Sequence, residues 1–585
     1  MKLSSRTTSL LTAFLIAVMV LPADLPGQKR TSLSTVATRE LSSDQAIVHA
    51  LNRLGFGPRP GDLERVRQVG LAKYIDQQLS PSSDPEPAVQ ARLERYKTLD
   101  MSTRELLKEY PQPKQAAKKA GMTPEEYRKR MEERKMQDRR PGGDPDGDQA
   151  MMRAAANGPQ RVVAELSLAK LTRAVYSERQ LQEVMVDFWF NHFNVFAGKG
   201  PDRWMLTEYE RDVIRPRTMG KFRDLLGATA SSSAMLFYLD NWMSADPVAA
   251  AKMSGELEQR REMMLARMND PRQQERMRRN GRDPQEARKK MEFAKQRMPK
   301  GLNENYAREL MELHTLGVDG GYTQKDVLEV ARAFTGWTLR APRQTADFFF
   351  DDRLHDTGAK TVLGKTINAG GMKDGEAVLD LLARHPSTAR FISTKLARRF
   401  VTDDPPKALV DRMAKSFLAS DGDIRTVLRT MIESPEFWSR ETYRAKIKRP
   451  FELVASAVRV TGADLDSPLP LLQWTDRIGE PLYRCQPPTG YSDKAEAWVN
   501  TGTLLNRMNF GLALAGNRMR GVRVDAASLL GSMSDDPLAQ AIQVFLAGQV
   551  SPETRASLEK QLAEQKPVPE VVAGLVLGSP EFQRR

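Results

Sequence analysis

The sequence predicts a mainly α-helical protein, a multi-helix array with one small β-hairpin and two long charged insertions. Apolar residues recur with a period near 3.6 along most of the chain, as in amphipathic helices. Capping patterns such as TQKD (323–326) and DKAE (493–496) accompany that period. A strand pattern is confined chiefly to residues 347–363, where a Phe run and a Thr-Val-Leu run flank a DTG turn that predicts the hairpin.

Residues 1–27 have the pattern of a secretory signal peptide. Lys2 and Arg6 precede the apolar run Leu10–Val20, which is short for a membrane span and is followed by small residues. No twin arginine precedes the run, and the one cysteine, Cys485, cannot form an intrachain disulfide. We therefore expect export by the general secretory route to the periplasm or the exterior, with no transmembrane anchor in the mature form.

Residues 44–585 are predicted to form a single large helical domain with two flexible insertions. The first, at about 111–158, is polar and ends in RRPGGDPDGD, which can bury little apolar surface. The second, at about 245–300, is rich in Arg, Met and Gln, with 15 Lys/Arg against 9 Asp/Glu. Its two interpretations are a surface excursion, which we favour, and a specific docking arm. The net charge of +14 does not indicate nucleic-acid binding, because no basic motif interleaved with aromatics is present.

The segment NENYARELMELHTLG (303–317) reads as one helix with a single anomalous carboxylate. Asn303 is placed as its N-cap and Gly317 as its end. A surface ladder at i, i+4 spacing is predicted for Glu304, Arg308 and Glu312. Glu309 falls between Leu313 and Leu316 on the helical wheel, toward the core. A carboxylate there must be paired, protonated or bound to a metal, so Glu309 is half of a structural ion pair, the interpretation we favour, or a site residue.

Histidines supply the other candidates for a site. In LQEVMVDFWFNHF (181–193), His192 lies at the centre of an apolar stripe, while Asp187 points away from it. Such a histidine is a hydrogen-bonded core residue, or a ligand or base. His355 stands beside Asp356 in the predicted hairpin.

These residues allow two kinds of chemistry if the fold brings them together. A two-histidine, one-carboxylate metal site or an acid/base cluster could use His192, Glu309, His355 and Asp356. Arg308 and Lys360 would then be available for an anionic group of a substrate. The sequence identifies neither a metal nor a cofactor.

Three long strings carry a resemblance to a known family: NENYARELMELHTLGVDGGYTQKDVLEVARAFTGWT, LHDTGAKTVLG and CQPPTGYSDKAEAWVNTGTLLNRMNF. Together they resemble the bacterial domain of unknown function 1800 family, from about Asp44 to the C-terminus. The resemblance implies an exported bacterial protein, often encoded beside a sulfatase-like exported protein that is a possible partner. The two basic insertions depart from the compact family pattern.

Two hypotheses about function follow. The favoured one is a non-catalytic envelope scaffold or binding protein, because helix chemistry explains most of NENYAREL and no recognisable nucleophile or complete metal motif is present. The alternative is an exported metal-dependent hydrolase or oxidoreductase that uses His192, Glu309 and His355. Their mutual distance discriminates between the two, since metal ligands lie roughly 3 Å apart.

Overall fold

The computed structural model describes residues 33–585 apart from 113–114, 118–119, 124, 128, 131–132, 134–157, 280–282, 284, 286–300, 532–535 and 565–567. The predicted signal peptide therefore lies outside the described residues, as does much of the first insertion. The described part is mainly helical, as predicted, and its strands occur only as short antiparallel pairs.

The helices of the described residues fall into three runs along the chain. The N-terminal ones are α1 (Leu33–Ala37), α2 (Ser43–Arg53), α3 (Asp62–Val69), α4 (Leu71–Leu79), α5 (Pro87–Leu93) and α6 (Thr103–Glu109). The middle ones are α10 (Gln160–Tyr176), α11 (Gln180–His192), α12 (Asp202–Glu208), α13 (Phe222–Ala230), α14 (Ser233–Tyr238), α15 (Pro247–Asn269), α16 (Pro271–Arg279), α18 (Glu304–Glu312) and α19 (Gln324–Ala333). The later ones are α20 (Met372–Ala383), α21 (Pro386–Phe400), α22 (Lys407–Ala419), α23 (Ile424–Ile432), α24 (Pro450–Val460), α25 (Leu469–Ile478), α26 (Thr501–Ala515), α27 (Ala526–Leu530), α28 (Pro537–Leu546), α29 (Pro552–Ala563) and α30 (Pro569–Gly578).

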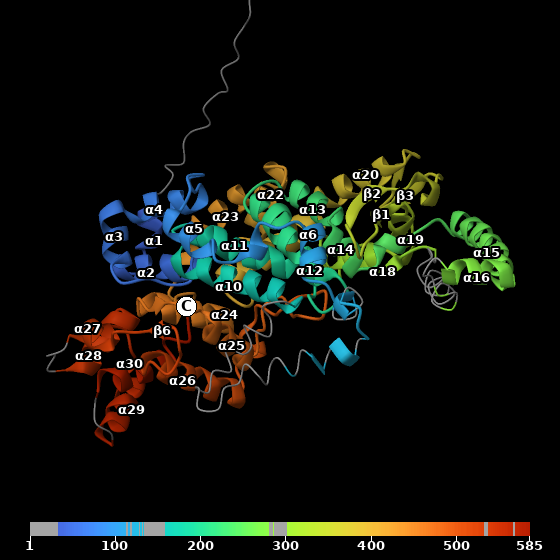
Figure 1. Cartoon of the computed structure of the whole chain (residues 1–585). Helices are drawn as coiled ribbons and strands as arrows, with labels where there is room; N and C mark the ends of the chain where they lie inside the picture. Colours follow the sequence, from blue (N-terminus) through green and yellow to red (C-terminus); the bar gives the residue numbers. More distant parts are fainter. Residues whose placement is uncertain are drawn as a thin grey trace, which may run out of the picture.

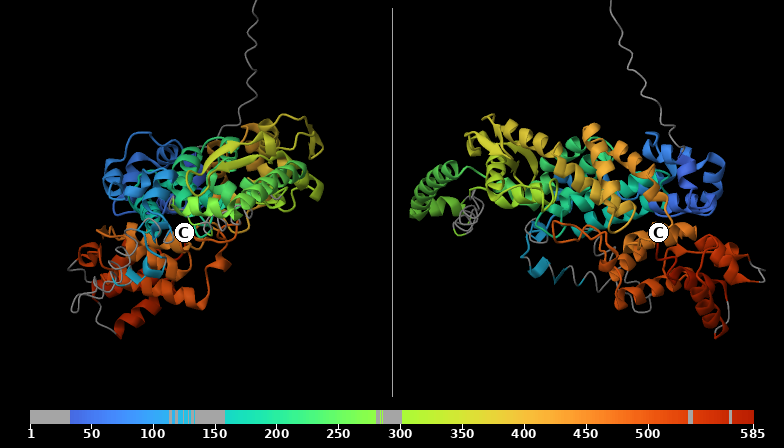
Figure 2. Two further views of the ribbon diagram at one scale, coloured as in Figure 1. Left: turned by 45° about the vertical axis from the view of Figure 1, so that its right-hand side comes forward. Right: turned by 180° about the vertical axis from the view of Figure 1, so that it is seen from behind.

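These helices form an elongated layer with a second group beneath one end (Figure 1). The layer runs from α1–α4 at one end, through α10–α14 and α21–α23, to α20 and the strands between residues 337 and 367 at the other (Figures 1 and 2). Helices α26–α30 lie below the N-terminal end, and the C-terminus of the chain sits between the two groups. One hydrophobic cluster extends through both groups, from Ala37 to Phe582. None of the described helices combines the length and apolarity that a membrane crossing requires.

The strands pair differently from the predicted single hairpin, so that prediction is wrong in detail. The Phe run, β2 (Asp347–Phe350), pairs with β1 (Trp337–Arg340), while β3 (Lys360–Val362) pairs with β4 (Lys365–Ile367). The second hairpin turns through Leu363 and Gly364, both at positive φ (48° and 72°). Two such residues suit the tight turn of a two-residue hairpin, which the DTG sequence does not form here. A third pair, β5 (Asp464–Leu465) with β6 (Val522–Arg523), lies outside the predicted region.

The second insertion begins as two helices that project from the end of the body. Helices α15 and α16 stand clear of the strands and of α19 in Figure 1 and in the right-hand view of Figure 2. Only the start of α15 packs on the body, in a small cluster of Ala245, Ala250 and Leu354. The ends of the insertion meet, because the amide of Ala245 donates to the carbonyl of Gly301 at 3.0 Å.

We predict that residues 246–300 can be removed without unfolding the rest. Ala245 and Gly301 already lie side by side, so a short Gly-Ser linker can join them, and little apolar burial is lost with α15. The melting temperature, followed by circular dichroism, should fall by less than about 5 °C. Loss of the cooperative transition in the deletion variant would show that the core depends on this segment.

Candidate functional site

Helix α18 begins where the sequence predicts but ends before the predicted residue, Gly317. The side-chain oxygen of Asn303 accepts the amide of Tyr306 at 3.1 Å, which confirms the N-cap. The helix ends at Glu312 rather than at Gly317. The Thr315 hydroxyl donates to the Leu310 carbonyl at 2.7 Å. In a continued helix that carbonyl would accept the amide of His314, so the hydroxyl replaces a helical hydrogen bond.

The predicted charge ladder on α18 is replaced by contacts with the next helix. Arg308 donates to the Gln324 side chain at 2.6 Å, and Gln324 donates to Glu304 at 2.7 Å. Glu312 accepts the hydroxyl of Tyr322 at 3.1 Å. The role of Arg308 toward a substrate stays a prediction.

Glu309 is half-buried and forms no ion pair with any residue that the structure describes. The favoured interpretation as half of an ion pair therefore finds no support. Burial and the neighbouring Glu312 raise the pKa of Glu309, and Arg308 only partly opposes them. Burial without a cationic partner makes the charged form of this carboxylate less stable than it would be in water.

His192 faces inward, as predicted, with 1% of its surface exposed. Its Nε2 lies 3.1 Å from the carbonyl oxygen of His314, and its Nδ1 has no partner among the described residues. Burial, with Lys395 and His314 nearby, keeps the pKa of His192 well below its usual value, so the ring is neutral at pH 7. The other face of α11 is also buried: Asp187, which the sequence places away from the apolar stripe, is 3% exposed.

His355, Lys360 and Asp374 form a closed polar cluster under the two hairpins. His355 Nδ1 lies 2.8 Å from the carbonyl oxygen of Thr335, and its Nε2 lies 3.0 Å from Asp374 Oδ2. Lys360 is fully buried and donates to the same Asp374 oxygen at 2.6 Å. Burial raises the pKa of Asp374, but the hydrogen bonds from Lys360 and His355 outweigh it, and the net shift is downward. Both ring nitrogens of His355 are thus committed within the fold.

Asp356 belongs to the wall of this cluster. Its two oxygens accept two hydrogen bonds from Arg332 at 2.8 and 3.0 Å, and its carbonyl accepts Lys360. Since Lys360 has no exposed surface, its predicted contact with a substrate would require the hairpins to open. These polar contacts join β3, α19 and α20 to one another.

The structure does not bring the candidates together as metal ligands. In the part of the chain that it describes, no three His, Cys, Asp or Glu side chains are grouped to hold an ion. His192 lies against the end of α18, whereas His355 lies beneath the hairpins. The catalytic role assigned to His192, Glu309, His355 and Asp356 stays a prediction without a shared site.

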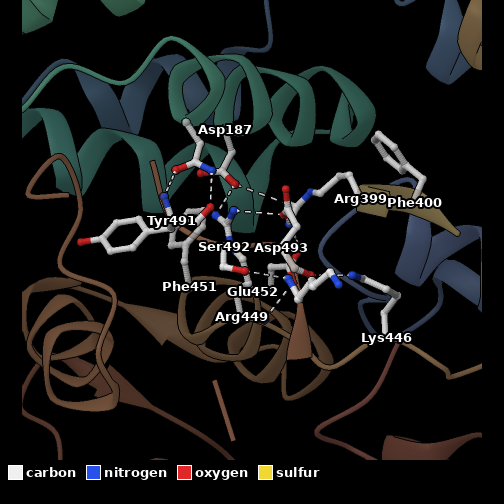
Figure 3. A network of polar contacts seen from close by, with 12 residues as sticks. Asp187, Arg399, Phe400, Lys446, Arg449, Phe451, Glu452, Tyr491, Ser492 and Asp493 are labelled. Atoms are coloured by element: carbon white, nitrogen blue, oxygen red, sulfur yellow. Dashed lines mark hydrogen bonds and ion pairs between the residues drawn. The ribbon is translucent and has the colours of Figure 1, made fainter. Parts of the chain in front are cut away.

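A larger charged network occupies the centre of the molecule (Figure 3). Asp187 of α11 contacts Lys170 at 2.8 Å, Arg449 at 2.7 Å and Arg399 at 3.4 Å. All four side chains are less than 9% exposed. Coulombic attraction from Arg449, Lys170 and Arg399 outweighs burial and keeps the pKa of Asp187 well below its ordinary range.

The same network joins the later elements to this centre. Glu452 contacts Arg399 at 2.6 Å and the C-terminal residue Arg585 at 3.1 Å, and these cations lower its pKa to about 2 despite burial. Glu480 lies 2.7 Å from Arg449, and Asp493 lies 3.5 Å from it. Each carboxylate named here has a cationic partner within 4 Å among the described residues, so the network joins the elements that carry these side chains.

A cavity of about 460 Å³ lies between the N-terminal and C-terminal helix groups. Its walls come from α2, the turn before α3, α24, α27, α28 and the last residues of the chain. Two polar side chains on one wall contact each other: Lys448 Nζ lies 2.7 Å from Ser456 Oγ. The Lys448 Nζ also lies 3.9 Å from the ring centre of Phe582.

Gly57 brings its backbone against this wall. Its φ of +94° favours glycine, and a Cβ there would lie 3.2 Å from Ser456 Oγ and 3.3 Å from Asn52 Oδ1. Ser456 and Asn52 therefore lie next to each other beside the turn. Neither Lys448 nor Ser456 could be found from the sequence, because they are eight residues apart in KRPFELVAS and match no catalytic pattern.

The comparisons with known proteins match the resemblance seen in the sequence. A family model described as a protein of unknown function (DUF1800) matches residues 49–584, nearly the whole chain. No curated protein and no solved structure shows a significant match. These comparisons therefore assign neither an activity to the chain nor a ligand to the cavity.

We predict that Glu309→Gln leaves stability at pH 7 unchanged or slightly higher. The pKa of Glu309 is raised in the folded state, so its stability contribution is lost as pH rises through that pKa. The two proteins should melt alike near pH 4, where the carboxyl is protonated, and the variant should melt no lower at pH 7 or 8. A loss beyond about 1 kcal/mol at pH 7, measured by chemical denaturation, would restore the ion-pair interpretation.

Proposed function

The chain belongs to the DUF1800 family of proteins of unknown function, and we propose that it is a binding protein whose cavity takes an amphipathic anion with an acyl chain. The observation that carries this proposal is the combination of apolar walls and an excess of cations around one cavity of about 460 Å³. That volume falls in the range typical of small-molecule sites, roughly 300–1,000 Å³.

The apolar part of the cavity suits a hydrocarbon chain. It is lined by side chains from helices of both groups, among them Val48, Leu63, Val460, Val544, Leu546 and Phe582. Removing a chain of methylene groups from water into such a site stabilises binding by about 0.8 kcal/mol for each group.

The polar part of the cavity suits an anionic head group. Arg444 and Arg584 line it against the single acid Glu581, while a third guanidinium, that of Arg59, is paired with Glu178 and Asp62. Arg444 donates to the carbonyl oxygens of Gln549 and Leu546, at 3.0 and 2.6 Å, and has no carboxylate within 4 Å among the described residues. Glu581 accepts the amide of Ser551 at 3.1 Å. The cavity therefore keeps positive charge that the fold does not neutralise.

Export places this binding function outside the cytoplasm. We infer it from the basic residues and apolar run of the first 27 residues, and envelope acyl compounds would then be within reach. A sulfatase-like exported protein remains a proposed partner on the ground of the family resemblance alone. The metal-dependent alternative gains no support from the arrangement of His192, Glu309 and His355.

Titration calorimetry with decanoate tests the proposal. We expect one molecule bound per chain, and weaker or no binding of decyltrimethylammonium, which has the same chain and the opposite charge. Val544→Phe should fill the cavity and weaken decanoate binding by at least about tenfold, equivalent to about 1.4 kcal/mol. Gln540→Phe, an exposed residue on the same helix that does not line the cavity, is the matched control and should bind as the parent does.

Two results would contradict the proposal. One is equal affinity for the anion and the cation, which would mean that the arginines do not select the head group. The other is unchanged decanoate binding in Val544→Phe, which would place the ligand elsewhere.

A further inference from the structure

Lys448 is a buried amine without a carboxylate partner. It is 4% exposed, and no described Asp or Glu oxygen lies within 4 Å of its Nζ. Glu452, which attracts this amine electrostatically, is already paired with Arg399 and Arg585. Burial, followed by repulsion from Arg444, lowers the pKa of Lys448 well below its ordinary value. Burial of this kind favours the neutral amine, whose lone pair can accept a proton.

Ser456 is directed at that amine rather than at its own helix. Buried hydroxyls elsewhere in the fold donate to the carbonyl four residues earlier, as Thr172 and Thr461 do at 2.8 and 2.7 Å. The contact of Ser456 Oγ in the described structure is instead with Lys448 Nζ at 2.7 Å. The hydroxyl, 3% exposed, lies on the wall of the cavity.

We propose that Ser456 and Lys448 form a nucleophile and base pair that hydrolyses acyl esters held in the cavity. The inference rests on the proposed function, since the acyl chain of the substrate would occupy the site assigned to the amphipathic anion. A hydroxyl beside a base inside a cavity is the arrangement that serine acyl transfer requires.

The reaction balances with water as the only co-reactant. Lys448 Nζ takes the Ser456 proton as Oγ bonds to the carbonyl carbon of the ester. The tetrahedral intermediate then expels the alkoxide, which leaves as the alcohol with the proton from Lys448. Water, deprotonated by Lys448, attacks the acyl-Ser456 ester and releases the carboxylic acid, and the proton returns to Oγ.

The reaction product matches the proposed ligand of the cavity. Hydrolysis of an acyl ester leaves a carboxylate on an alkyl chain, and the cations that face the cavity would hold that carboxylate until release. Binding of decanoate would then report the product complex of the reaction.

Labelling with a decyl fluorophosphonate tests the pair, because this probe phosphonylates an activated serine and loses fluoride. We expect one adduct per chain by intact-mass spectrometry, mapped to the peptide that contains Ser456. Ser456→Ala should abolish it, and Lys448→Met should slow it by at least about a hundredfold. Ser557→Ala is the control, since Ser557 is an exposed serine of α29 that does not line the cavity, and it should label as the parent does.

Parallel decanoate titrations separate this inference from the proposed function. Decanoate binding with no adduct at Ser456 would overturn the nucleophile pair and leave the binding function intact. An adduct at Ser456 without decanoate binding would support the pair and overturn the binding function. Unchanged labelling in Ser456→Ala or in Lys448→Met would also overturn the pair. Only a variant that melts as the parent does counts in this comparison. Because Ser456→Ala only removes one oxygen, we expect it to fold.

Discussion

The contact of Asp187 with three buried cations is the interaction on which the rest of the structure depends. Arg399 comes 212 residues after Asp187 in the chain and Arg449 comes 262 residues after it, so one carboxylate joins α11, α21 and the start of α24. Placing charges in a protein interior is unfavourable unless each is matched, and removing one partner of a buried pair typically costs about 3–5 kcal/mol. Since Arg585 adds the C-terminus to the same network, both helix groups are held to one centre.

The same network positions the cavity. Between residues 446 and 456, side chains alternate between the two: Arg449 and Glu452 enter the network, while Lys448 and Ser456 face the cavity. The network also acts on the pKa of Lys448: burial and Arg444 lower it most, Glu452 of the network opposes them, and Arg585 of the network lowers it further. The charged network around Asp187 thereby constrains the position of Lys448 and Ser456 and the charges that surround them.

Helical periodicity predicted most of the fold and the local direction of single residues. It identified the inward position of His192 and the cap at Asn303, both of which depend on neighbours within a few turns. It could not show that Asp187 is buried, because a helix packed on all sides has no solvent face for its polar residues to occupy. Pairing over hundreds of residues leaves no periodic signal, so the partners of Asp187 were not predictable. The pair Lys448 and Ser456 was not predicted for a related reason. The cavity that the pair faces is lined in part by α28 and by residues near the chain end, which are distant in the sequence.

A double-mutant cycle between Asp187 and Arg449 tests the central claim most directly. The free energy of unfolding would be measured by denaturant titration for Asp187→Asn, Arg449→Met and the double variant. If the network holds the two helix groups together, each single change should destabilise by about 3–5 kcal/mol, because the other charge stays buried and unpaired. The double variant should then lose at least about 2 kcal/mol less than the two single losses added together. Additive losses, to within about 0.5 kcal/mol, would contradict the account.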